Sequence, residues 1–201
     1  MKIRTVLIAA SLLALLIACS RENRSGQPEV DTTGNVQSEQ QTGSASATTT
    51  GVTGGTSTAM TNEDKEFVTK AGMGGLAEVQ AGTLALQKAT NADVKAFAQR
   101  MVTDHSKANA ELAQFATAKG LALATELDAD HKAAADHLAS LSGAEFDKAF
   151  MQHMVEDHEK AVADFDKAST SATDVDLKAW AGKTLPTLKE HLEMAKGTAR
   201  S

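Results

Sequence analysis

Two aspartate–histidine pairs, Asp104-His105 and Asp157-His158, occupy matching places in two long helical segments. At about 100° per residue, each pair fills a gap in an apolar stripe, with one side chain on either side of the stripe's centre. Imidazole nitrogens and carboxylate oxygens together suit Zn, Fe, Mn or Cu. The spacing therefore predicts a transition-metal site inside a helical bundle.

The two pairs belong to an internal repeat. Alignment of residues 95–112 with residues 148–165 gives 11 identities in 18 positions, with the pattern K-A-F-x-Q-x-M-V-x-D-H-x-K-A-x-A. Self-similarity of this kind indicates duplicated structural units. The two histidines are therefore expected to play equivalent roles on two different helices.

Two further side chains extend the candidate site. His191 lies at the edge of the apolar face of the last helical segment, and Glu78 lies about 100° from the Leu76/Val79/Leu86 stripe of the first. Heights along the helices match for Glu78 and His105, at roughly 18 and 22 Å, but match poorly for His158 and His191, at roughly 15 and 27 Å. The candidate metal-site residues are Glu78, Asp104, His105, Asp157, His158 and His191.

A purely structural network is the alternative to a metal site. In it, Asp104 and Asp157 accept hydrogen bonds from His158 and His105 and fix the helix register without any ligand. No Ser or Cys nucleophile constellation and no phosphate-binding glycine loop is present, so no catalytic residue is assigned. A metal-dependent oxidoreductase is the minority interpretation, and an enzyme is less expected than a binding or structural protein.

Residues 61–201 have the composition of an alanine-rich helical domain. Tyrosine is absent, and Pro186 is the only proline in this part, which argues against a β-rich fold. Capping-box patterns at Thr61/Asp64, Thr90/Asp93, Ser142/Glu145 and Thr173/Asp176 mark four helix starts. The predicted long helices span 62–89, 91–119, 143–168 and 174–197, with Gly120 as a C-cap and a shorter helix over 128–141. The fold class is an all-α four-helix bundle with one extra short helix, and the family resemblance given below implies that it is ferritin-like.

The N-terminus has the pattern of a lipoprotein signal. Lys2 and Arg4 precede an apolar run that is too short to span a membrane and that ends in Leu16-Ile17-Ala18-Cys19, a lipobox. Residues 1–18 are the predicted signal peptide, and Cys19 is the predicted lipidation site. Several acyl chains on one residue give stable anchoring. Ser20 after the cysteine indicates the outer membrane, with the protein facing the periplasm.

The segment 19–60 is predicted to be a disordered tether rich in Gly, Ser and Thr. Its low apolar content cannot offset the entropy of ordering. The whole chain carries a formal charge of −6, which argues against nucleic acid as a partner, and its single Cys excludes an intramolecular disulfide. The membrane is the one partner expected, through the lipid anchor.

Three segments carry a resemblance to a known family. GLAEVQAGTLALQKATNADVKAFAQRMVTDHSKANAEL, GAEFDKAFMQHMVEDHEKAVADF and LPTLKEHLEMAK are similar to a bacterial envelope family of unknown function with a ferritin-like domain, often labelled "predicted outer membrane protein". The resemblance covers about residues 61–197 and implies a periplasm-facing bundle with no established activity. The recurring polar positions that it implies are Glu78, Asp104, His105, His158 and His191.

The chain departs from a di-iron ferritin. It contains no Glu followed three residues later by His, and it has no Tyr, so ferroxidase, peroxidase or oxygenase chemistry is not expected. The connection over 120–141 is long enough for a ferritin-type crossover, and an up-down-up-down course is the alternative. Two main functional hypotheses remain: a lipid-anchored module that binds a metal ion or small ligand, and a structural or stress-related interaction module.

Overall fold

The computed structural model describes residues 60–200, which fold into five helices. These are α1 (Asn62–Lys88), α2 (Ala92–Ala118), α3 (Ala129–Ser140), α4 (Gly143–Ser171) and α5 (Val175–Thr198). No strand occurs between residues 60 and 200, and none of the five helices is long and apolar enough to cross a membrane. The all-α bundle with one extra short helix is confirmed. The predicted signal peptide, Cys19 and nearly all of the tether lie outside the described residues.

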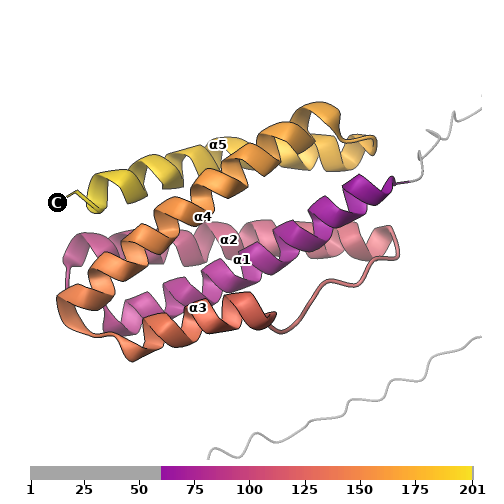
Figure 1. Cartoon of the computed structure of the whole chain (residues 1–201). Helices are drawn as coiled ribbons and strands as arrows, with labels where there is room; N and C mark the ends of the chain where they lie inside the picture. Colours follow the sequence, from indigo (N-terminus) through magenta and orange to yellow (C-terminus); the bar gives the residue numbers. More distant parts are fainter. Residues whose placement is uncertain (1–59, 201) are drawn as a thin grey trace, which may run out of the picture. The chain divides into compact units, whose positions relative to one another are not determined.

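The four long helices form two antiparallel hairpins, α1–α2 and α4–α5, and α3 lies along α1 (Figure 1). Between the hairpins, α1 packs beside α4 and α2 beside α5. The start of α4 lies at the α1–α2 turn, because Asp147 bonds Thr90 there, while the end of α2 lies at the α4–α5 turn, where Lys119 bonds Asp174. The connection through α3 therefore returns the chain along the bundle. The helices run up-down-down-up, which is the ferritin-type crossover.

The helix starts follow the predicted pattern in part. Thr61 and Asp64 form the predicted reciprocal capping box, and Gly120, with φ of 70°, follows the last turn of α2. Ser142 is the N-cap of α4, but its side chain makes no capping hydrogen bond.

Two of the predicted capping boxes are wrong by one residue. The N-caps of α2 and α5 are Asn91 and Asp174 instead of Thr90 and Thr173. The physical reason is that the backbone amides of both threonines are held by aspartates of the opposite hairpin. The threonines therefore belong to the docked turns and not to the caps.

Each hairpin turn docks on a buried aspartate of the other hairpin. The carboxylate of Asp147 accepts from the backbone amides of Thr90 (3.0 Å) and Asn91 (2.9 Å) and from the Thr90 hydroxyl (2.5 Å). At the other end of the bundle, Asp64 accepts from the amides of Thr173 and Asp174, both at 3.2 Å. Hydrogen bonds to a charged acceptor are stronger than neutral ones, so these two carboxylates fix how the hairpins are aligned.

The apolar core is divided along the bundle. One cluster lies at the Thr90 end around the stacked rings of Phe146 and Phe150, and others lie toward the Asp174 end around Leu112, Leu177 and Phe165. A layer of polar side chains separates them. Apolar packing therefore holds the bundle at both ends and leaves the middle for the candidate site.

Removal of the Asp147 carboxylate tests the role of the docked turn. Asp147→Ala leaves the amides of Thr90 and Asn91 without their acceptor, so we expect the free energy of unfolding to fall by about 2–4 kcal/mol. The measurement is urea unfolding followed by circular dichroism. Asp136→Ala is the matched control, because Asp136 is exposed and its one ion pair with residues 60–200 is to Lys132 on its own helix. Equal losses in the two variants would contradict the proposed role.

Candidate functional site

Each of the four long helices contributes one buried ionisable side chain to the middle of the bundle. These are Glu78 from α1, His105 from α2, His158 from α4 and His191 from α5, with exposed fractions of 7, 5, 0 and 0%. The ring centroids of the three histidines, here called the histidine cluster, lie 5.2 to 5.6 Å apart. One candidate ligand atom from each ring lies within 4.8 Å of the others.

The structure corrects the expected difference in height between His158 and His191. Helix α4 continues to Ser171, beyond its predicted end at residue 168. His158 therefore lies 13 residues before the end of α4, and His191 lies 16 residues after the start of α5. At 1.5 Å per residue these positions correspond to roughly 20 and 24 Å, so the two rings meet.

Glu78 connects two of the histidines. Its Oε2 lies 2.9 Å from His105 Nδ1 and its Oε1 lies 3.5 Å from His158 Nδ1. His158 Nδ1 also lies 2.9 Å from the carbonyl oxygen of Met154, one turn earlier on α4. Both Nδ1 atoms therefore face acceptors, which assigns each of them a hydrogen and leaves the Nε2 atoms of His105 and His158 for contacts within the cluster.

His191 is held from the opposite side. Its Nε2 lies 2.9 Å from Asp104 Oδ2, and its Nδ1 lies 3.3 Å from His105 Nε2. Asp104 is itself fixed by Arg100 Nε at 2.6 Å, and Arg100 also bonds Glu190 at 3.0 Å. Asp104 thus orients the His191 ring from the half-exposed edge of the bundle and lies outside the histidine cluster.

Asp157 does not join the histidine cluster. It pairs with His153 Nε2 at 3.1 Å on its own helix and with Lys160 at 3.5 Å. The expected pairings of Asp104 with His158 and of Asp157 with His105 are wrong, because Asp104 bonds His191 and Glu78 occupies the position beside His105. Although the repeat places both Asp–His pairs alike on their helices, only the histidines reach the bundle axis.

One nitrogen of the histidine cluster lacks a partner. Among the side chains of residues 60–200, His158 Nε2 and Trp180 Nε1 are the buried polar atoms without a hydrogen bond. A buried polar atom of this kind costs free energy and calls for an explanation. The ring of His158 lies 5.6 Å from that of His105 and 5.5 Å from that of His191, measured between centroids.

The burial of Glu78 was underestimated from the sequence, because the large aliphatic side chains of α1 suggested a different face as the buried one. The large side chains Leu76, Val79 and Leu86 are only partly buried, whereas the buried face consists mainly of small residues. Its members are Asp64, Val68, Gly72, Gly75, Glu78, Ala81, Gly82 and Ala85. In a helix of this composition, the glycine and alanine positions that permit close approach were the better signal of the interior.

The charge state of the Glu78–His105 pair follows from burial and mutual attraction. Burial by itself would raise the pKa of Glu78, but the attraction and hydrogen bond of His105 outweigh it and lower that pKa below its usual value. Burial opposes a charge on His105, and the facing Glu78 carboxylate outweighs it, so the pKa of His105 is raised. The pair is therefore a carboxylate and an imidazolium that stabilise each other.

The other two histidines stay neutral. Burial lowers the pKa of His158, and the nearby charge of His105 adds to this effect. Burial also lowers the pKa of His191 to about 4, although the hydrogen bond that His191 donates to Asp104 opposes this shift. Neutral imidazole is the form that binds metal ions.

The low pKa of His191 predicts a pH dependence of stability. An unfolded His191 titrates near 6.5 and the folded one near 4, so the unfolded chain binds more protons between these values and stability falls as pH falls. When the pH falls from 7 to 4.5, the free energy of unfolding of the metal-free wild-type protein should fall by on the order of 2 kcal/mol more than that of His191→Gln. Urea unfolding with chelator present measures this, with His137→Gln, an exposed position on α3, as control. Parallel pH profiles for wild type and His191→Gln would contradict it.

Comparison with known proteins places the fold in a family. The crystal structure of a DUF305 fragment from Deinococcus radiodurans is similar, with a TM-score of 0.63, 14% identity, and coverage of 72% of this chain and 100% of that one. At this identity, the likeness shows the fold alone. No curated protein matches the chain. A family model described as "Domain of unknown function (DUF4142)" matches residues 50–198, most of the sequence, and the chain therefore belongs to the DUF4142 family.

Proposed function

We propose that the bundle binds one transition-metal ion through His105, His158 and His191, as the folded part of a lipid-anchored protein of the cell envelope. The observation that carries the metal site is the convergence of three buried imidazoles from three helices, each offering a nitrogen within 4.8 Å of the others. Imidazole is a ligand for Zn, Cu and Fe, and the three rings together provide an all-nitrogen site.

One nitrogen pair of the histidine cluster has the spacing that a tetrahedral ion requires. His191 Nδ1 lies 3.3 Å from His105 Nε2. Two ligands at about 2.0–2.1 Å from a tetrahedral Zn²⁺ lie roughly 3.3–3.4 Å apart. In the metal-free protein a proton lies between these atoms, and an ion that replaces it makes use of both lone pairs. His158 Nε2, which is buried without a partner, is the third ligand.

The surrounding carboxylates suit an outer shell around this ion. Ligating histidines usually donate their second ring nitrogen to a carboxylate or a carbonyl, which fixes the ring and raises its basicity. Glu78 serves His105 in this way, Met154 O and Glu78 serve His158, and Asp104 serves His191. Three protein ligands leave a further coordination position for water or for a small molecule.

The structural network is the competing function and rests on its own observation. The Glu78–His105 and Asp104–His191 pairs are complete without any ion. Buried paired groups of this kind specify the alignment of helices. The two functions differ in one respect, since only a metal site makes the stability of the protein depend on a metal ion.

The envelope location rests on the N-terminal sequence. Lys2 and Arg4, the short apolar run and the lipobox at Leu16–Cys19 support export and acylation of Cys19. These residues precede the part of the chain that the structure describes. The anchor would place the bundle on the periplasmic face of the outer membrane, where the tether keeps it within reach of periplasmic ions.

Metal binding is tested by removal of the unpartnered ligand. Protein purified without a histidine tag should bind one Zn²⁺ or Co²⁺ per chain and gain about 2.7 kcal/mol of stability when the free ion is at a hundredfold excess over its dissociation constant. His158→Leu should abolish this gain, because the third ligand is lost, while the apolar side chain keeps the core filled. Calorimetry and thermal melting with and without chelator measure both effects.

The control for this experiment is His137→Leu, which removes an exposed histidine of α3. It should leave the stoichiometry and the metal-dependent melting temperature unchanged. Substoichiometric metal in the purified wild-type protein, together with melting that a chelator does not change, would favour the structural network instead.

Lipid anchoring is tested at Cys19. Cys19→Ser removes the acceptor of the acyl chains, so we expect the protein to move from the membrane fraction to the soluble fraction of the cells that export it. Ser20→Ala leaves the cysteine in place and should stay with the membranes. Membrane retention of Cys19→Ser would contradict the assignment of the lipobox.

A further inference from the structure

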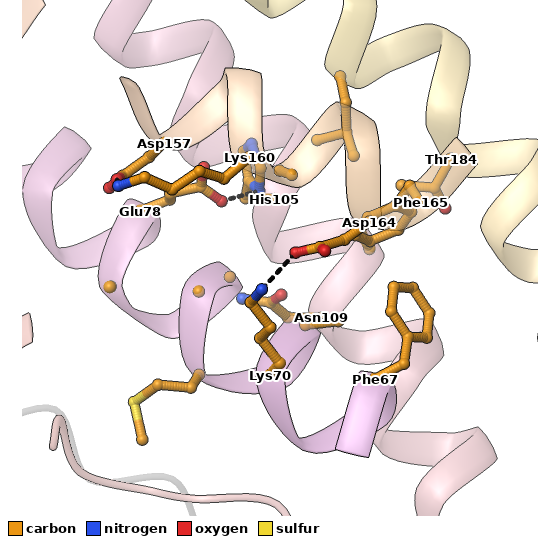
Figure 2. Close-up of a pocket in the computed structure, with 18 of the residues that line it drawn as sticks. Phe67, Lys70, Glu78, His105, Asn109, Asp157, Lys160, Asp164, Phe165 and Thr184 are labelled. Carbon is orange, nitrogen blue, oxygen red and sulfur yellow. Dashed lines mark hydrogen bonds and ion pairs between the residues drawn. The ribbon is translucent and has the colours of Figure 1, made fainter. Parts of the chain in front are cut away.

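The two hairpins form a half-open cavity beside the histidine cluster, with a volume of about 680 Å³. We propose that it binds a neutral small molecule with an aromatic body and a hydrogen-bonding group directed at Asn109. Figure 2 shows the cavity with Phe67 and Phe165 on one side and with Glu78 and His105 on another. This inference goes beyond metal binding and does not depend on it.

The size of the cavity suits a small organic molecule. Ligand pockets commonly measure about 300–1,000 Å³, and most of their lining is apolar. The space arises because small side chains line it where the two hairpins face each other, among them Ala71, Ala108 and Ala161. Larger side chains at these three alanine positions would fill the cavity.

Aromatic rings form one wall of the cavity. The ring centroids of Phe67 and Phe165 lie 5.0 Å apart in an edge-to-face arrangement. The ring centroid of Trp180 lies 6.3 Å from that of Phe67 and 5.3 Å from that of Phe165. Ring pairs of this geometry add to the apolar burial, and an aromatic ligand extends the same packing. This wall therefore favours a flat aromatic body over a flexible chain.

All but two of the ionic groups around the cavity already have partners; the two exceptions, Lys65 and Glu66, are exposed to solvent and form no ion pair with any residue between 60 and 200. Lys70 pairs with Asp164 at 2.6 Å, a contact that Figure 2 shows, and Glu78 pairs with His105 at 2.9 Å. A charged ligand would lose its hydration without a free counter-charge inside, which is costly. The cavity therefore selects a neutral molecule.

Asn109 supplies the polar contact. Its amide lines the cavity and makes no hydrogen bond to any residue between 60 and 200. The absence of a side chain at Gly75 creates its place, because a Cβ there would lie 2.0 Å from Asn109 Oδ1. An amide that is free to donate and to accept complements a carbonyl, amide or phenol group of the ligand.

The test uses the natural reporter of the cavity, since Trp180 is the only tryptophan of the chain. The full chain, stripped of metal with a chelator, is titrated with prodan, a neutral naphthyl ketone whose emission depends on polarity. We expect one dye per chain, quenching of Trp180 and a blue shift of the dye. Anilinonaphthalenesulfonate, an anionic dye with a related ring system, should bind at least about tenfold more weakly.

Matched variants separate the cavity from the surface. Ala161→Phe fills the cavity and should weaken prodan binding by at least about tenfold, whereas Ala163→Phe, exposed on the same helix, should not. Ala108→Leu repeats the test from α2 if Ala161→Phe does not fold. The proposal would be overturned if Ala161→Phe and Ala108→Leu bound prodan as tightly as Ala163→Phe does. Tighter binding of the anionic dye than of prodan would also overturn it.

The role of Asn109 has its own readout. Asn109→Ala should weaken the binding of prodan by about five- to tenfold, as expected for one lost hydrogen bond. The affinity for dimethylaminonaphthalene, which lacks the ketone, should stay unchanged. An equal effect on both molecules would overturn the assignment of Asn109. Metal binding is measured separately on the same variants, so failure of either function is distinguishable from failure of the other.

Discussion

The buried ion pair between Glu78 and His105 is the interaction on which the centre of the bundle depends. A buried carboxylate is costly unless an opposite charge and hydrogen bonds compensate it, and His105 at 2.9 Å provides both. The pair requires α1 and α2 to meet at one height. His158 and His191 lie at the same height only because α4 and α5 are aligned with the first hairpin. The carboxylates of Asp147 and Asp64, which hold the turns at the two ends, supply that alignment.

The division into two hairpins explains why the polar site and the cavity lie together. Large apolar side chains pack at both ends of the bundle, whereas the cavity between the hairpins is lined by many alanine, glycine and polar residues beside its aromatic wall. Small residues leave space, and buried polar residues need partners across that space. Glu78, His105 and His191 accordingly line the same cavity as Asn109 and the aromatic wall. A metal ion held by the histidines would thus lie beside the proposed small-molecule site.

Features that repeat along the chain were predictable from the sequence, and features that depend on distant partners were not. The Asp104-His105 and Asp157-His158 repeat identified two of the three cluster histidines, and the composition identified the all-α fold. The burial of Glu78 was hidden, because its face of α1 is made of glycine and alanine and the larger aliphatic residues suggested another face. The shifted caps at Thr90 and Thr173 depend on aspartates 57 and 109 residues away, which helix periodicity does not reveal.

The internal repeat also explains how the site is placed on the bundle axis. Helices α2 and α4 both start at the Thr90 end and run parallel, and each packs against α1 and α5, so they lie diagonally across the bundle. Equal sequences on diagonal parallel helices bring equal residues to the axis at similar heights, as seen for His105 and His158. Helices α1 and α5 lack this repeat and bring different groups, Glu78 and His191. Because of this departure from the repeat, the site has three imidazoles and one buried carboxylate. This donor set suits a single cation, and it differs from the paired carboxylates that hold a di-iron centre.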